Sequence, residues 1–273
     1  MKHLVKNTKK LIYFLFAGIF LIACGKVPIP DKNQTVLHFA DNFESGNLGK
    51  FELLVKDTNI NTLFVSNPLK EGNYSLKTVL QASDFVAHGY RTELCVYECA
   101  KYKTEVFYGF SFMIDTAYKE ESYNLICQWQ DLPNYQMGES WNPMPRLHGS
   151  SPPLHIVYLD NHIQVKMNTN PRSNHFNFGV GDIQEIQKGV WNDIVMHVYW
   201  SDKDDGFVEC WLNGNLITPY NGTDYKFYKR NLFNRAGNYF KFGQYRGAVK
   251  PLYTNAVYFD EVKIGTSYAE VAP

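Results

Sequence analysis

The chain has 273 residues, of which 45% are hydrophobic and 20% charged, as is ordinary for a globular protein with a full core. Aromatic residues make up 16%, with 19 Tyr and 19 Phe, which favours strands and aromatic-lined binding surfaces. The formal net charge is zero, so a basic field over the whole protein that would attract nucleic acid is excluded.

The N-terminal segment is typical of an export signal. Its positive residues are Lys2, Lys6, Lys9 and Lys10. The apolar run 11–23 is too short to span a bilayer comfortably, and it ends in "LIACG", which resembles a bacterial lipoprotein box. We therefore expect residues 1–24 to be a signal peptide cleaved before Cys24, whose sulfur carries lipid. The protein would be a lipoprotein of the cell envelope or secreted; a plain signal peptide or an N-terminal anchor is the alternative. Residues 25–36, polar with two prolines, indicate a tether.

The rest of the chain, residues 37–273, is expected to form a single domain. Short runs of β-branched and aromatic residues recur, with turn signals such as Asn213-Gly214 between them. Many strands at short, regular spacing predict an all-β fold, an antiparallel β-sandwich or jelly roll. The long irregular stretch 131–153 is typical of a lid or the wall of a groove.

Four cysteines lie in this domain. Cys95 and Cys99 are expected to bracket a short loop, "CVYEC", for which a local disulfide is plausible in an exported protein. Cys127 and Cys210 lie in apolar strand patterns and are expected to be buried thiols or a cross-strand pair. No cysteine spacing resembles a zinc site.

Three stretches place polar side chains on one face of a strand and apolar side chains on the other. They are "RTEL" at 91–94, "QWQ" at 128–130 and "YFKFGQYR" at 239–246. If the three strands lie side by side, their polar faces form a floor suited to a polyanion that also carries hydroxyls. That floor would contain Arg91, Gln128, Gln130, Lys241 and Tyr245.

In this order, the three stretches resemble motifs of the jelly-roll polysaccharide lyases, which include alginate lyases and their glucuronan-lyase and heparin-lyase-I relatives. Framework stretches such as "DNFESG", "SPPLHIVY" and "VYFDEVKIG" extend the resemblance over nearly all of the mature chain. The resemblance implies a concanavalin-like jelly roll with a substrate groove on one sheet. It also implies a carbon–oxygen lyase that cuts an anionic, uronic-acid-containing polysaccharide by β-elimination, leaves unsaturated uronyl ends and requires no cofactor for catalysis.

β-Elimination needs three chemical roles. The uronate carboxylate must be neutralised, a base must remove the C5 proton, and an acid must protonate the departing O4. By the resemblance, Arg91 and Gln128 match the carboxylate-binding residues. Tyr245 matches the acid, and in some members the base as well. Lys241 would hold the anion and favour a lower pKa for Tyr245 through its positive charge.

One position departs from the alginate-lyase pattern, because Gln130 stands where those enzymes have His. Either the tyrosine makes both proton transfers, or another histidine makes one. His88 is the first choice if Gly89 forms a bulge that turns it toward the groove, although strict alternation places it on the opposite face from Arg91. His148 and His155 are the next candidates. In glucuronate the C5 proton and O4 leave on the same side, so one tyrosine suffices. This favours glucuronan or ulvan over alginate or heparin-like polymers. The remaining expected substrate contacts are Glu93, Gln130, Arg146, His148, His155 and Arg246.

Each polar pair also has an ordinary structural explanation. Arg91 with Glu93 could be an ion pair, the two glutamines a solvated strand face, and Lys241 with its tyrosine an amphipathic edge. The metal content is unknown, although a structural calcium site could be formed by Asp41, Glu44 and Asp260, since calcium prefers oxygen ligands.

Two other functional classes compete with a lyase. A non-catalytic carbohydrate-binding lipoprotein would not need the tyrosine beside Lys241. A glycoside hydrolase would need two carboxylates at the bond, and Glu93 is the only acid in the three motifs. As partners we expect the polysaccharide, and a membrane reached through the lipid anchor. We expect no nucleic acid and a monomer.

Overall fold

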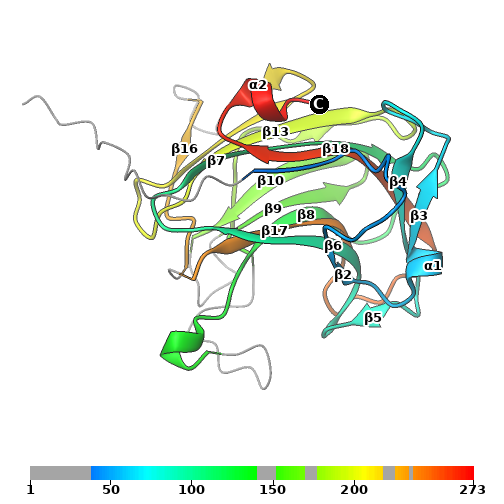
Figure 1. Ribbon diagram of the computed structural model, residues 1–273, viewed down its shortest axis with the longest axis horizontal. Helices are drawn as coiled ribbons and strands as arrows, with labels where there is room; N and C mark the ends of the chain where they lie inside the picture. The colour runs from blue at the N-terminus through cyan, green and yellow to red at the C-terminus, as the bar shows by residue number, and fades with distance from the viewer. Residues whose placement is uncertain (1–37, 140–151, 170–176, 218–224, 234–235) are drawn as a thin grey trace, which may run out of the picture. The chain divides into compact units, whose positions relative to one another are not determined.

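The computed structural model describes residues 38–139, 152–169, 177–217, 225–233 and 236–273. Within residues 35–273, which form one compact unit, the strands build two antiparallel sheets of nine strands each. Figure 1 shows them as two layers, with β7, β13 and β18 in one and β6, β8 and β17 in the other. The predicted all-β sandwich is confirmed.

Sheet A contains β15 (Asn215–Leu216), β14 (Phe207–Leu212), β13 (Asn192–Tyr199), β7 (Glu105–Ile114), β18 (Asn255–Gly265), β4 (Ser75–Leu80) and β3 (Thr62–Val65) in spatial order, with β1 (Phe39–Asp41) on β18 and β16 (Phe227–Tyr228) on β14. Sheet B contains β11 (Asn177–Gly179), β10 (His162–Asn168), β9 (Leu154–Leu159), β8 (Asn124–Asp131), β17 (Asn238–Tyr245), β6 (Gly89–Ala100) and β2 (Glu52–Leu54), with β12 (Gln184–Glu185) on β10 and β5 (Phe85–Val86) on β6. The described helices are short: α1 (Thr58–Asn61), η1 (Tyr135–Met137) and α2 (Tyr268–Val271). None of the described helices is long and apolar enough to cross a membrane.

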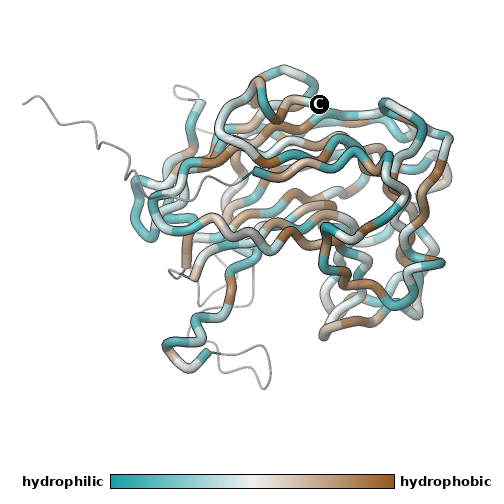
Figure 2. Tube along the Cα trace, in the orientation of Figure 1, coloured by the Kyte–Doolittle hydropathy of each residue, from teal (hydrophilic) through white to brown (hydrophobic). Residues whose placement is uncertain are grey.

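The core lies between the two sheets and is rich in aromatic rings. Phe240 and Phe242 of β17 face it, and their rings contact Phe110 of β7 and Phe259 of β18 at centroid distances of 6.0 and 5.2 Å. Apolar and polar residues alternate along many strands, as Figure 2 shows. Because the apolar set of each sheet B strand is buried against sheet A, its polar set must point to the opposite side of sheet B.

A close approach of two strands shapes one end of β17. At Gly243 the backbone φ is +131°, and a Cβ atom there would lie 2.1 Å from the carbonyl oxygen of Thr92 on β6. Only glycine fits this position. The register between β17 and β8 shifts over the same stretch, between Phe242 and Tyr245. Tyr245 comes to lie opposite Arg91 of β6.

The cysteines differ in part from the expectation. The stretch that contains Cys95 and Cys99 is no loop, because both residues lie within the continuous strand β6. Cys95 is a free, buried thiol, so the suggested local disulfide is wrong. Cys127 and Cys210 are also free and buried, which agrees with the expectation of buried thiols.

Candidate active site

The three predicted motif strands are neighbours in sheet B, in the order β8–β17–β6. Lys241 pairs with Gln128 on one side and with Cys95 on the other. Paired residues project from the same side of a sheet. We call the side of sheet B that is turned away from the core the polar face; it carries Arg91, Glu93, Gln128, Gln130, Lys241 and Tyr245.

Glu93 is the centre of the polar face. Its Oε2 accepts a hydrogen bond from Arg91 Nη1 at 3.2 Å and lies 3.5 Å from Lys241 Nζ. Its Oε1 accepts a short hydrogen bond from the side-chain amide of Gln128. Glu93 is only 2% exposed. One buried carboxylate therefore fixes three side chains that come from three strands.

These contacts decide between the structural alternatives. Arg91 and Glu93 do form an ion pair, within the larger cluster around Glu93. Gln128 and Gln130 are buried, so they are not a solvated strand face. Lys241 lies on a strand between two others and is 2% exposed, so it does not belong to an amphipathic edge.

Tyr245 lies at the more open end of the cluster. The guanidinium carbon of Arg91 is 4.3 Å from the centroid of its ring, and Lys241 Nζ is 5.8 Å from the same centroid. Both distances lie within the range of cation–π contacts. Arg91 Nη2 also donates to the carbonyl oxygen of Ala87 at 3.1 Å.

The electrostatics around Tyr245 differ from the expectation. Burial raises the pKa of its hydroxyl, and the opposing effect of Arg91 is smaller. The predicted lowering by Lys241 is therefore wrong in its net direction. Burial also lowers the pKa of Lys241, against the attraction of Glu93, because a charged amine is costly to desolvate. Tyr245 thus stays protonated at neutral pH, as a proton donor must.

His88 occupies the turn of a hairpin beside this cluster. Val86 of β5 pairs with Gly89 of β6, and the two residues between them, Ala87 and His88, have φ angles of +45° and +65°. Positive φ at both central residues is typical of a type I′ turn rather than of the suggested bulge. A Cβ at Gly89 would lie 2.7 Å from the ring of Tyr245, so the turn packs against that tyrosine, and His88 itself is exposed.

Of the other predicted substrate contacts, some lie on the polar face and others do not. Gln130 lies on the polar face, opposite Tyr239, and donates to Asp131 Oδ1. Arg246 does not join the cluster: its guanidinium is buried, forms an ion pair with Glu121 and donates to Ser122. Arg146 and His148 lie outside the described residues.

His155 lies on the polar face, on β9 opposite Gln128. It is 7% exposed, and its Nδ1 has no hydrogen-bond partner among the residues that the structure describes. Burial, followed by the charge of Lys166, lowers the pKa of the imidazole to about 4, while a hydrogen bond to the Pro152 backbone opposes the shift. The ring is therefore neutral at neutral pH.

The suggested calcium ligands are engaged in local hydrogen bonds. Glu44 accepts from the backbone of Asn73 and Tyr74. Asp41 accepts from the backbone of Phe43, and Asp260 from that of Glu261. Within the described part of the chain, no group of three or more His, Cys, Asp or Glu side chains could hold a metal ion. The residues present therefore do not fit a calcium site of the suggested composition.

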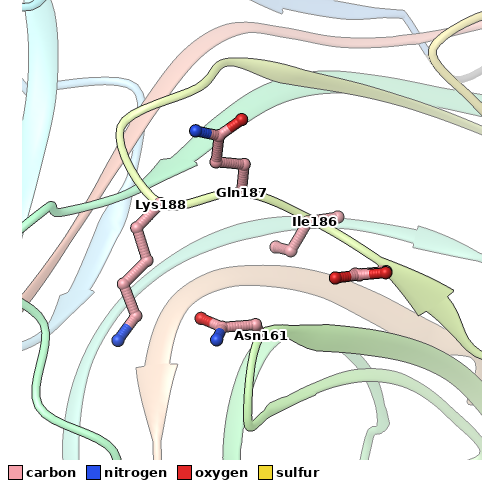
Figure 3. Close-up of a pocket in the computed structure, with 5 residues that line it drawn as sticks. Asn161, Ile186, Gln187 and Lys188 are labelled. Carbon is pink, nitrogen blue, oxygen red and sulfur yellow. The ribbon is translucent and has the colours of Figure 1, made fainter.

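One pocket lies apart from the polar face. It has a volume of about 660 Å³ and is lined by Asn161, Glu185, Ile186, Gln187 and Lys188. Figure 3 shows Lys188 and Asn161 on its wall. Lys188 already forms an ion pair with Glu120 at 2.8 Å. None of the residues predicted from the motifs lines this pocket.

Sequence reasoning overlooked two residues. Tyr123 lies near Tyr245, since a Cβ atom at Gly247 would be 3.6 Å from the hydroxyl of Tyr123 and 3.8 Å from the hydroxyl of Tyr245. Lys166 pairs with His155. Alternation along "HIQVKMN" could have placed Lys166 on the polar face, but the neighbouring strand had to be known first.

Comparison with known proteins decides the family. The family model for polysaccharide lyases matches residues 43–263. The chain belongs to the polysaccharide lyase family. This lyase is similar in fold to an endo-β-1,4-glucuronan lyase from the fungus Trichoderma reesei, with a TM-score of 0.66, 20% identity, and coverage of 88% of this chain and 99% of that chain. It is also similar to the alginate lyase A1-II′, with a TM-score of 0.52, 12% identity, and coverage of 81% and 96%. No curated protein matches the sequence.

Proposed function

We propose that this lyase cleaves a glucuronate-type polymer, such as glucuronan or ulvan, in preference to alginate or heparin-like chains. The observation that carries the proposal is the cluster in which Glu93 holds Arg91 and Lys241 next to Tyr245. Two cations around one carboxylate leave a net positive charge at the place where an anionic sugar would bind.

Neutralisation of the substrate carboxylate is the first chemical role. Arg91 Nε has no hydrogen-bond acceptor among the described residues, although it is buried. It is therefore a donor that remains available for the uronate carboxylate. Removing negative charge from that carboxylate stabilises the enolate-like intermediate that forms when the C5 proton leaves.

Tyr245 and His88 would share the proton transfers. The base takes the C5 proton, a double bond forms between C4 and C5, the C4–O4 bond breaks, and O4 takes the proton of the Tyr245 hydroxyl. A tyrosine with a raised pKa is suited to donate a proton but not to remove one. We therefore propose a histidine as the base, with His88 as the first choice and His155 as the next candidate; a tyrosine acting alone is the alternative.

The position of the His88 turn supports glucuronate as the sugar that is cut. Gly89, next to His88, lies against the ring of Tyr245, and we infer that a base at His88 and the acid at Tyr245 act on the same side of the sugar. In glucuronate the C5 proton and O4 leave on the same side. The glutamine at 130, where alginate lyases carry His, and the similarity to a glucuronan lyase agree with this choice.

Activity on a panel of polymers tests the proposal. Glucuronan, ulvan, alginate and heparin would be incubated with the enzyme, and unsaturated uronyl ends would be measured by their ultraviolet absorbance. We expect the highest kcat/KM on glucuronan or ulvan. A higher value on alginate or heparin would contradict the proposed substrate class while leaving the lyase family intact.

We also propose that the mature protein begins at Cys24, carries lipid on that sulfur and acts as a monomer in the cell envelope. The lysine-rich start and the "LIACG" stretch support the anchor. Mass spectrometry of the membrane fraction should find an acylated Cys24. An unmodified N-terminus at another residue would overturn the anchor.

A further inference from the structure

A row of polar side chains continues from the cluster across the polar face. The register pairs Lys241 of β17 with Gln128 of β8, Gln128 with His155 of β9, and His155 with Lys166 of β10. Paired residues share a face, so all four project from the same side of sheet B.

The core confirms this direction. Leu154 and Ile156, the neighbours of His155, belong to the buried core, and so do the neighbours of Lys166 on β10, Val165 and Met167. Strand alternation then sends His155 and Lys166 to the polar face.

Lys166 differs from the other cations of this face. Glu93 accompanies Arg91 and Lys241, whereas half-buried Lys166 forms no hydrogen bond or ion pair with any residue that the structure describes. His155 beside it is neutral and adds no charge. This end of the row therefore carries a positive charge for which none of the described residues is a counter-ion.

His155 supplies a second, directional group. Pro152 has no backbone N–H, so its hydrogen bond with the imidazole uses the Pro152 carbonyl as acceptor and a ring N–H as donor. Because Nδ1 is the nitrogen without a partner, it remains as a buried acceptor. A buried acceptor without a donor is costly, and a sugar hydroxyl would satisfy it.

Lys166 lies too far from the cluster around Glu93 for both to bind the same sugar. Neighbouring strands are about 4.8 Å apart, so the three steps from β17 to β10 span about 14 Å. An acidic group held at Lys166 would therefore belong to a different sugar from the one whose carboxylate meets Arg91.

We propose that Lys166 and His155 form a second anion-binding subsite, which holds the carboxylate or sulfate of another sugar along the same polymer through Lys166 and one of its hydroxyls through His155. The subsite rests on the proposed function, since it presumes a polyanion that crosses the strands of sheet B.

Kinetics of Lys166→Met test the subsite. Because a hydrogen bond to a charged group contributes about 1.5–3 kcal/mol, we expect KM on polymer to rise about tenfold or more with little change in kcat. Lys166→Arg should restore most of the affinity. Lys203→Met removes the same charge from an exposed turn after β13 and should leave KM unchanged. A KM for Lys166→Met equal to that of the wild type, or an equal rise for Lys203→Met, would overturn the subsite.

Two polymers distinguish the acidic groups. An effect of Lys166→Met on glucuronan, which has carboxylates only, indicates a carboxylate at the subsite, and an effect confined to sulfated ulvan indicates a sulfate. Binding of both polymers to the Tyr245→Phe enzyme, by calorimetry, separates the subsite from turnover. Adding Lys166→Met to that background should weaken binding about tenfold, and unchanged binding would overturn the subsite. Absence of ultraviolet-absorbing product from the wild type would instead count against the proposed function, and absence of any binding would overturn both.

Discussion

The guanidinium of Arg91 lies across the ring of Tyr245, with its central carbon 4.3 Å from the ring centroid. The arginine therefore contacts Glu93 at one nitrogen and the proposed proton donor through its flat face. A charge held over the ring limits how far burial can raise the pKa of the tyrosine hydroxyl. The same arginine can thus bind the substrate carboxylate and position the acid.

Tyr245→Phe removes the hydroxyl and leaves a ring for Arg91 to pack against. General acid–base catalysis typically contributes roughly 100- to 10,000-fold, so kcat should fall by that factor. The melting temperature should stay close to that of the wild type, because the packing is kept. Steady-state kinetics and calorimetric melting check both parts. A variant with near-normal turnover would show that Tyr245 is not the acid.

His88→Asn tests the base. Asn is accepted at the positive φ of a type I′ turn, so the hairpin should survive where Ala would strain it. We expect a loss of activity comparable to that of Tyr245→Phe. Substantial remaining activity would support a tyrosine that makes both transfers.

Glu93→Gln tests whether one carboxylate organises the cluster. The variant keeps the shape but leaves Arg91 and Lys241 as buried cations without a counter-ion. Breaking a buried ion pair from one side costs about 3–5 kcal/mol, so the free energy of unfolding should fall by about that amount in urea denaturation. Glu185→Gln, at an exposed position, is the matched control and should change nothing measurable. Equal stability of the two variants would argue against the organising role.

Lys241→Arg addresses the alkaline side of the pH profile. Burial lowers the pKa of Lys241, so as the pH rises this lysine should lose its proton earlier than an ordinary lysine does. Deprotonation removes positive charge from the cluster, and kcat/KM should fall. An arginine does not deprotonate in this range, so the alkaline fall should move to higher pH in the variant, whatever its maximal rate. An unmoved alkaline limb would assign that limb to another group.

His155 makes a prediction about stability. The imidazole has a pKa of about 4 in the folded protein, below its usual 6.5, so the unfolded chain binds more protons between these values. Stability should therefore fall as the pH drops from about 6.5 to about 4, by up to about 3 kcal/mol for this group. In His155→Gln that part of the loss should be absent. Urea denaturation of both proteins at pH 7 and pH 4 measures the difference, and identical losses would contradict the assigned burial.

Much of the fold and of the motif strands could be predicted from local pattern. Alternation along "YFKFGQYR" is enough to separate Phe240 and Phe242 from Lys241 and Tyr245, because a core face and a polar face repeat every two residues. The bridging role of Glu93 could not be found this way, since it depends on how three strands far apart in sequence align. The turn at His88 was misjudged because Ala87 and His88 adopt the positive φ angles of a two-residue hairpin, although neither is the Gly or Asn that usually signals such a turn.

Arg246 shows a different limit. It was expected among the substrate contacts, but its side chain points away from the side of Tyr245 and forms an ion pair with Glu121. The partner lies in a loop whose position depends on the whole fold. For Lys166, alternation along its own strand predicts the face of the sheet correctly. Its pairing with His155 of β9 could not be predicted, because it depends on which strands are neighbours.

The most direct test of the account is the product of wild-type enzyme and glucuronan. We expect an ultraviolet-absorbing unsaturated uronate whose mass is lower by one water than that of the hydrolysis product, and almost none of it from Tyr245→Phe under the same conditions. Saturated products of full hydrolytic mass, or equal amounts of unsaturated product from both proteins, would contradict β-elimination with Tyr245 as the acid.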